Sequence, residues 1–175
     1  MTPMAQPALH DTCDAERNAL VSEILSFARE RGLTLGTAES CTGGLVAAAL
    51  TDVAGSSDVF RGGVVSYWEE VKTDVLGVSA DVIENDGVVS AACAEQMAAG
   101  ACKVIGCDVA VSTTGIAGPG GGSPDKPVGT VWVGLAAKGR TQSTLLTLEG
   151  SRAQIREDAV SAALQNFFEF LKRVV

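Results

Sequence analysis

The chain has 175 residues, which fits one domain with a sizeable core, and 46% of them are apolar while 19% are charged, a composition typical of globular proteins. Acidic residues outnumber basic ones by 21 to 13, giving a net charge of −8 and no basic stripe, so we expect no nucleic-acid partner. No apolar run reaches the roughly 20 residues of a membrane span, so we expect no membrane association either.

In the first half of the chain, the hydrophobic pattern predicts helices that alternate with short strands. We expect a flexible tail over residues 1–12, helices over 13–31, 43–51 and 69–76, strands over 33–38 and 62–67, and a brief extended segment at Val88-Val89. Gly32 directly follows the first helix, as is common at a helix C-terminus.

In the second half, Ser90 is a suitable N-cap for a helix through residue 105, and an apolar strand follows over 108–113. A glycine- and proline-rich loop over 115–129 then precedes a hairpin, with strands 130–137 and 141–148 about Lys138-Gly139-Arg140. Ser151-x-x-Gln154 is a capping box that opens the last helix. This order predicts a single domain over 13–175, an α/β protein with a three-layer α/β/α sandwich and a mixed sheet.

The five cysteines, at positions 13, 41, 93, 102 and 107, are odd in number and form no CxxC pair. Since no signal peptide precedes them, we expect reduced thiols and a cytoplasmic location. No cluster of residues has the spacing of zinc ligands, and we expect neither a metal nor a cofactor.

Ser40 and Cys41 lie in a glycine-bearing turn between a predicted strand and a predicted helix. Backbone N–H groups at such a turn stabilise anions and can form an oxyanion hole, which makes Ser40 a candidate nucleophile. Two other interpretations stay open. Ser40 or Thr42 could simply cap the helix, and Cys41 could be the nucleophile, because a helix N-terminus lowers the pKa of a thiol.

The only histidine, His10, lies in the polar N-terminal tail, so a Ser-His-Asp or Cys-His site is excluded. A serine nucleophile would then need another base, and a desolvated lysine is the usual substitute. Lys72 is the candidate, with Tyr67 five residues before it across a strand-to-helix junction. The alternative is a solvated lysine beside Glu69 and Glu70.

Two further features favour a bound nucleotide. The loop over 115–129 contains six glycines and three prolines and follows a strand, where open α/β sheets bind ligands. Arg152 and Arg156 are four residues apart near the start of the last helix, so they share a face that could bind a phosphate. The alternatives are a surface loop and two solvated arginines.

Together these segments resemble the CinA C-terminal domain family, the nicotinamide-nucleotide amidohydrolases also called PncC or NMN deamidase. The resemblance covers roughly residues 15–172 and includes several motifs in the same order. They are AESCTGG at 38–44, Gly55-Ser56-Ser57 with Phe60, Gly62-Gly63, Tyr67 with Lys72, Leu76-Gly77-Val78, Val89-Ser90, TGIAGP at 114–119, KPVG at 126–129, and Gly150 with Arg152 and Arg156.

The resemblance implies hydrolysis of the carboxamide of nicotinamide mononucleotide to nicotinate mononucleotide and ammonia, in pyridine nucleotide recycling. It implies Ser40 as nucleophile, Lys72 as base and Tyr67 as an assisting residue. We expect the nucleotide to be bound by Cys41, Thr42, Gly43, Gly44, Gly63, Thr114, Gly115, Ile116, Ala117, Gly118, Lys126, Arg152 and Arg156. We also expect the stand-alone form of the domain and a homo-oligomer.

Two adjacent positions depart from the family pattern. After the tyrosine, the family usually has a small polar residue and then Asn, whereas this chain has Trp68 and Glu69. This change borders the expected site. It favours an alternative function, a catalytically inactive module that binds a nucleotide or a protein and is linked to competence or the DNA damage response.

Overall fold

The computed structural model describes residues 9–174, and their side chains from Asp14 onward. Five strands form one mixed sheet in the order β2-β1-β3-β4-β5. The strands are β1 (Leu35–Glu39), β2 (Phe60–Val65), β3 (Val109–Gly115), β4 (Thr130–Ala137) and β5 (Arg140–Thr147). β1 runs parallel to β2 and β3, whereas β4 is antiparallel to β3 and β5.

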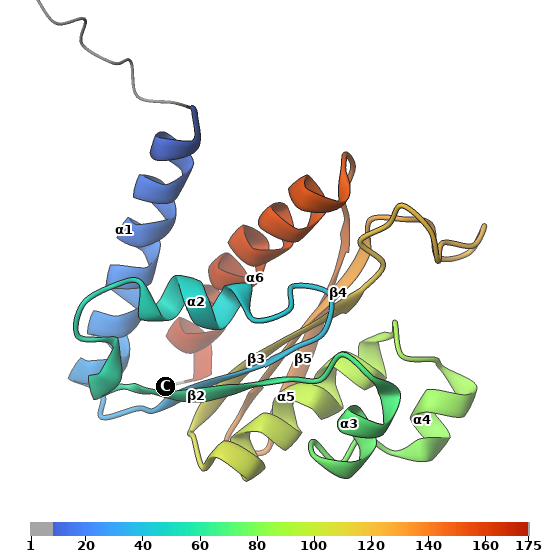
Figure 1. Cartoon of the computed structure of the whole chain (residues 1–175). Helices are drawn as coiled ribbons and strands as arrows, with labels where there is room; N and C mark the ends of the chain where they lie inside the picture. Colours follow the sequence, from blue (N-terminus) through green and yellow to red (C-terminus); the bar gives the residue numbers. More distant parts are fainter. Residues whose placement is uncertain (1–8, 175) are drawn as a thin grey trace, which may run out of the picture.

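Helices cover both faces of the sheet, which confirms the predicted three-layer sandwich (Figure 1). One layer contains α1 (Leu9–Glu30), α2 (Leu45–Thr51) and α6 (Arg152–Val174), and the other contains α3 (Glu69–Asp74), α4 (Ala80–Asn85) and α5 (Ala91–Ile105). The short 3-10 helix η1 (Ser56–Asp58) leads into β2. No helix within residues 9–174 combines the length and the apolar character needed to cross a membrane.

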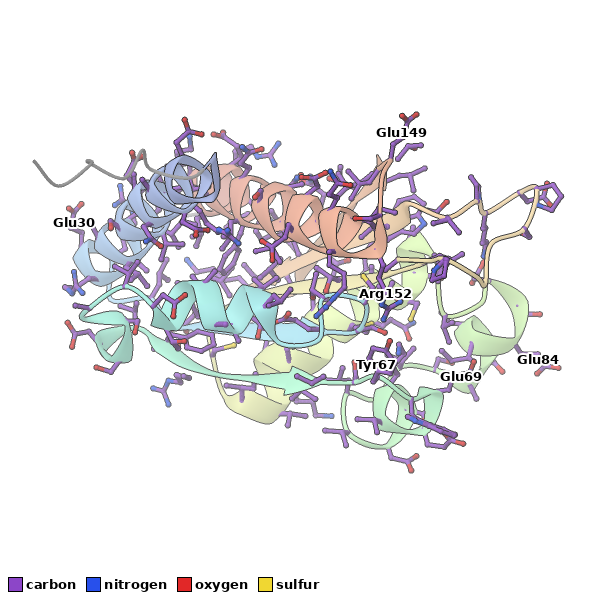
Figure 2. The ribbon with its side chains drawn as sticks, turned by 45° about the horizontal axis from the view of Figure 1, so that its top comes forward. Glu30, Tyr67, Glu69, Glu84, Glu149 and Arg152 are labelled. Carbon is purple, nitrogen blue, oxygen red and sulfur yellow. The ribbon has the colours of Figure 1, made fainter. Side chains whose placement is uncertain are left out.

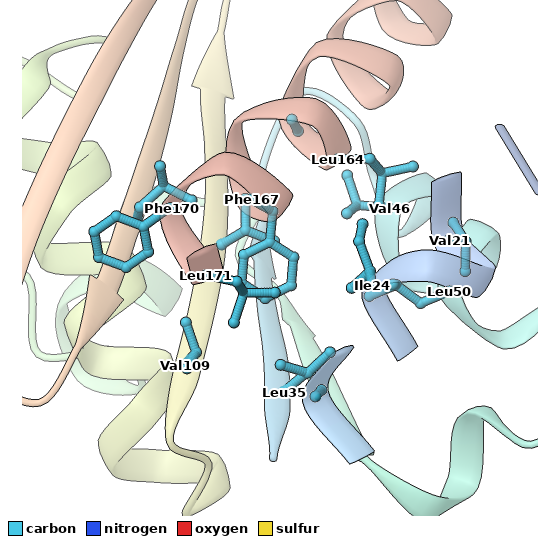
Figure 3. Packing of buried hydrophobic residues seen from close by; sticks show 14 of the residues in the cluster. Val21, Ile24, Leu35, Val46, Leu50, Val109, Leu164, Phe167, Phe170 and Leu171 are labelled. Atoms are coloured by element: carbon cyan, nitrogen blue, oxygen red, sulfur yellow. The ribbon is translucent and has the colours of Figure 1, made fainter. Parts of the chain in front are cut away.

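The larger part of the core lies between the sheet and the layer of α1, α2 and α6. Figure 3 shows Ile24 of α1, Leu50 of α2 and Phe167 of α6 converging over Leu35 and its neighbours on the sheet. All five residues of β1 are buried, as expected for a central strand covered on both faces. The site's strands are thereby fixed by packing on both sides.

The connections that carry the candidate residues leave the sheet at one edge. β1, β2 and β3 are parallel, and the ends of β1 and β2 pair directly at Glu39 and Val65. The segments after these strands contain Ser40, Tyr67 and the glycine-rich loop. Parallel sheets bind ligands at this edge, so the topology brings the expected site residues to a suitable place.

Several predicted boundaries were wrong. Residues 9–12 belong to α1 rather than to a tail, because no proline or glycine interrupts the helix there, and residues 1–8 lie outside the described part of the chain. β2 begins two residues earlier than predicted, since Phe60 already pairs with Leu35, and it ends before Tyr67.

Two elements after β2 also differ from the prediction. Val88-Val89 forms no strand. No helix was predicted over α4, which has only six residues and is capped by Ser79. The hairpin turn consists of two residues, Lys138 and Gly139, rather than three. The predicted N-cap Ser90 and the Ser151-Gln154 capping box are both confirmed.

Candidate active site

Ser40 directly follows β1 and continues its pairing, since the Ser40 N–H donates to the carbonyl of Thr113 over 2.9 Å. The chain then turns through Gly43 and Gly44, whose φ angles are 63° and 100°. Other residues rarely adopt these values, so the two glycines allow α2 to begin immediately behind Ser40. The N–H of Gly43 donates to the carbonyl of Ser40 over 3.1 Å, whereas no such bond involves the N–H groups of Cys41 and Thr42 among the described residues.

The Glu39 carboxylate organises the whole turn. It is only 1% exposed, and its Oε2 accepts hydrogen bonds from Thr42 Oγ1 at 2.7 Å, Gly44 N at 2.9 Å and Val46 N at 3.0 Å. Its Oε1 accepts another from Ala47 N at 2.8 Å. The first donors of α2 are therefore satisfied by Glu39, and neither Ser40 nor Thr42 caps the helix.

Replacing Glu39 with alanine is expected to lower the free energy of unfolding by about 2–4 kcal/mol, because several buried donors would lose their acceptor. Urea unfolding followed by circular dichroism measures this change. The matched control is Glu30→Ala at the exposed end of α1, where a shift of less than about 0.5 kcal/mol is expected. Equal stability of the two variants would contradict the assigned role of Glu39.

Lys72 lies on α3 with only 2% of its surface exposed, so the interpretation as a solvated lysine is wrong. Its Nζ contacts Ser40 Oγ at 3.2 Å and donates to the carbonyl of Ser66 at 2.6 Å. Burial lowers the pKa of Lys72, and Coulombic interactions with Cys93, Glu69 and Cys41 oppose this shift only in part. A lysine with a lowered pKa is the group that a serine nucleophile requires as its base.

Cys41 is also buried, with 6% of its surface exposed. Burial raises the pKa of its thiol to about 11, although nearby backbone N–H groups act in the opposite direction. The expected lowering by the helix N-terminus is thus outweighed by desolvation. Because the thiol keeps its proton near neutral pH, Cys41 is the weaker of the two candidate nucleophiles.

Arg152 connects three segments around Tyr67. Its Nη2 donates to the hydroxyl of Tyr67 over 2.9 Å, and its Nη1 donates to the carbonyl of Gly118 over 2.7 Å. Figure 2 shows Arg152 reaching from the start of α6 toward Tyr67, with Glu69 beside them. The connection after β2, the glycine-rich loop and α6 therefore meet at one place.

Arg156 has a different position from Arg152. Its Nε donates to the carbonyl of Cys41 over 3.1 Å, and its Nη2 donates to that of Thr42 over 2.8 Å. Arg156 thus supports the backbone of the turn behind Ser40. Helical spacing put both arginines on one face, but only the structure distinguishes their contacts.

A cavity of about 240 Å³ collects many of the expected residues. It is lined by Ser40, Cys41, Tyr67, Glu69, Lys72, Val88, Val89, Thr114, Gly115, Ala117 and Arg152. Glu69, Val88 and Val89 were absent from the predicted site. The sequence signal for Glu69 was its place between Tyr67 and Lys72, whereas the valines reach the cavity only through the segment that connects α4 to α5.

The remaining predicted residues lie around the cavity rather than in its wall. Thr42, Gly43 and Gly44 belong to the turn, and Gly63 lies within β2. Ile116 and Gly118 belong to the glycine-rich loop. The backbone of Ile116 closes the base of this loop, and the carbonyl of Gly118 accepts a hydrogen bond from Arg152. Lys126 extends from that loop and donates to the carbonyl of Asp86 over 2.8 Å. None of these residues is part of the cavity wall.

A larger cavity of about 510 Å³ lies elsewhere, between α1, α2 and α6. Its wall contains Asp14, Arg17, Asn18, Leu45, Ala48, Ala49, Asp52 and Glu157. The lining residues that the structure describes include no pair of nucleophile and base, so the smaller cavity is the better candidate for catalysis. Among the side chains described, those of residues 14–174, no three histidine, cysteine or acidic groups gather as metal ligands would.

Comparison with known proteins identifies the family. The sequence profile of the CinA C-terminal domain matches residues 17–171. A CinA-like protein of Mycolicibacterium gilvum is 51% identical over 151 residues, which cover 86% of this chain and 36% of the relative. The chain thus spans about a third of the length of that curated relative.

Solved structures agree with this assignment. The competence/damage inducible protein CihA of Agrobacterium tumefaciens is 38% identical in sequence and superposes with a TM-score of 0.86. The superposition covers 99% of this chain and 100% of that one. The competence damage-inducible protein A of Klebsiella pneumoniae is 35% identical, with a TM-score of 0.87 over 91% of this chain and 99% of that one. The chain belongs to the CinA C-terminal domain family.

Proposed function

We propose that this protein is an amidohydrolase that uses Ser40 and Lys72 to deamidate nicotinamide mononucleotide. The observation that carries the proposal is the 3.2 Å contact between Lys72 Nζ and Ser40 Oγ, made by a lysine that is only 2% exposed. A neutral amine at this distance can accept the serine proton as the hydroxyl attacks. The four described cysteines are free thiols, which supports the cytoplasm as the proposed location.

In the first half of the reaction, Ser40 Oγ forms a bond to the carboxamide carbon and its proton moves to Lys72 Nζ. The N–H groups of Cys41 and Thr42 would stabilise the negative oxygen of the tetrahedral intermediate. The N–H of Gly43 is not available for this role, because it donates to the carbonyl of Ser40. When the C–N bond breaks, Lys72 returns the proton to the departing ammonia.

The second half of the reaction cleaves the acyl-enzyme. Water attacks the ester carbon, Lys72 takes its proton, and that proton returns to Ser40 as the carboxylate leaves. Tyr67 could assist either transfer, because its hydroxyl accepts from Arg152 and its own proton stays available for donation. The sum is amide plus water to acid plus ammonia.

The dimensions of the cavity support a substrate that is only partly enclosed. Its volume of about 240 Å³ is below the range of about 300–1,000 Å³ found for sites that enclose drug-sized ligands. The nicotinamide ring with its carboxamide would fill this cavity, and the ribose phosphate would extend toward Arg152. Arg152 lines the cavity, and a guanidinium group binds phosphate well.

The Arg152→Ala variant is expected to lose more than about tenfold in kcat/KM for the mononucleotide, because a charge-assisted hydrogen bond contributes about 1.5–3 kcal/mol. Hydrolysis of the dephosphorylated riboside should change little, and this substrate controls for any effect through Tyr67. Both rates are measured by ammonia release. Equal use of riboside and mononucleotide by the wild type would exclude a phosphate role for Arg152.

The alternative function, a binding module without catalysis, is favoured by one observation. Trp68 is 72% exposed beside the cavity, as a residue at a protein interface often is. Ammonia release from nicotinamide mononucleotide by the purified protein decides between the two functions. Steady release supports the amidohydrolase, and binding without release supports the module.

A further inference from the structure

Glu69 is a charged group in the cavity that the proposed reaction does not use. Among the described residues that line the cavity, Glu69 is the only acidic residue, and Lys72 and Arg152 are the only basic ones. Lys72 is buried and acts as the base, which leaves a carboxylate and a guanidinium group. The wall therefore presents one negative and one positive group to a ligand.

The Glu69 carboxylate lies in the first turn of α3, where an acidic group is favourable, but it has no partner of its own among the side chains of residues 14–174. It forms no ion pair with them, and the hydrogen bonds around the site involve Ser40, Ser66, Tyr67 and Arg152 instead. It also borders a second hollow of about 370 Å³, shared with Tyr67, Trp68 and Glu70. Two aromatic residues, Tyr67 and Trp68, thus share this hollow with the Glu69 carboxylate at the edge of the catalytic cavity.

We propose that Glu69 and Tyr67 form a subsite for a positively charged aromatic ring, next to the anion-binding Arg152, which donates to the Tyr67 hydroxyl. A carboxylate attracts such a ring directly, and the face of a tyrosine attracts it through its quadrupole. The cavity would then select amides whose ring is cationic and whose distal part is anionic. This inference rests on the proposed function, since nicotinamide mononucleotide has a pyridinium ring and a phosphate.

The same carboxylate has a consequence for product release. Hydrolysis converts a neutral carboxamide into a carboxylate within the cavity that Glu69 also borders. Like charges at short range repel each other. Glu69 therefore favours the departure of the acid over its retention.

The test compares nicotinamide mononucleotide with its reduced dihydropyridine form, whose ring is neutral. Glu69→Gln is expected to raise KM for the cationic form at least about fivefold, the size expected for one charge pair near water, and to leave KM for the neutral form unchanged. The change falls on KM rather than kcat, because the ring stays cationic from bound substrate to transition state. Rates are taken on the pH plateau, since Glu69 also raises the pKa of Lys72.

The matched control is Glu70→Gln, which removes the same charge from the same helix outside the catalytic cavity and should change neither KM. Equal shifts for both ring forms, or none, would overturn the subsite while the amidohydrolase stands. If the wild type releases no ammonia, the proposed function fails, and calorimetric titration with both mononucleotides still tests the subsite. Weaker binding of the cationic form alone by Glu69→Gln supports it, and unchanged binding, or no binding by the wild type, overturns it.

Discussion

Replacing Ser40 with alanine is expected to lower ammonia release from nicotinamide mononucleotide by more than about 1,000-fold, the order seen when a catalytic serine is removed. The change deletes one oxygen from the wall of the cavity, so the nucleotide should bind with nearly unchanged affinity. Steady-state rates measure the loss of turnover. Isothermal titration of the variant with the mononucleotide measures binding. The wild type cannot be used for this titration, because it would hydrolyse the nucleotide.

The neighbouring thiol provides the control. Cys41→Ala is expected to keep most of the activity, because the raised pKa of Cys41 leaves the thiol protonated near neutral pH. Full activity of Ser40→Ala together with an inactive Cys41→Ala would reverse the assignment of the nucleophile. Loss of activity in both variants with retained binding would indicate that Cys41 also supports the geometry of the turn.

The contact between Ser40 and Lys72 illustrates what a sequence of this kind can predict. The absence of a usable histidine restricted the base to a few residue types, and the strand-to-helix positions of both residues indicated one sheet edge. These are local signals, readable from spacing and residue type. The sandwich and its mixed sheet followed in the same way from strands that alternate with helices and then pair as a hairpin.

The role of Glu39 could not be predicted by such signals. A glutamate at the end of a buried strand resembles any other acidic residue in the sequence, and only the path of the turn brings its oxygens to the N–H groups of Gly44, Val46 and Ala47. The different contacts of Arg152 and Arg156 likewise depend on how α6 packs against the turn. The contacts of the two arginines join residues that lie far apart in the chain. The predicted homo-oligomer, which depends on surfaces, stays a prediction.

Replacing Lys72 with arginine is expected to reduce kcat/KM by about 10²–10⁴-fold, as much as replacing it with alanine. Arginine keeps the positive charge but does not release its proton in proteins, so it cannot serve as a base. Because Lys72 is almost completely buried, thermal unfolding of both variants must accompany the rates. A folded Lys72→Arg variant that retained most of its activity would show that Lys72 contributes only its charge.

The pH dependence of the wild type tests the same assignment without a substitution. Below its pKa, Lys72 is protonated and cannot accept the Ser40 proton, so kcat/KM must rise with pH through the pKa of this amine. Burial lowers that pKa from the ordinary lysine value of about 10.4, and Coulombic interactions with Cys93, Glu69 and Cys41 oppose the shift only in part. The rising limb is therefore expected below pH 10.4, and Glu69→Gln should move it to still lower pH by removing one of the opposing charges. A limb at or above the ordinary lysine value would mean that the amine stays solvated during turnover, which is incompatible with the buried contact to Ser40.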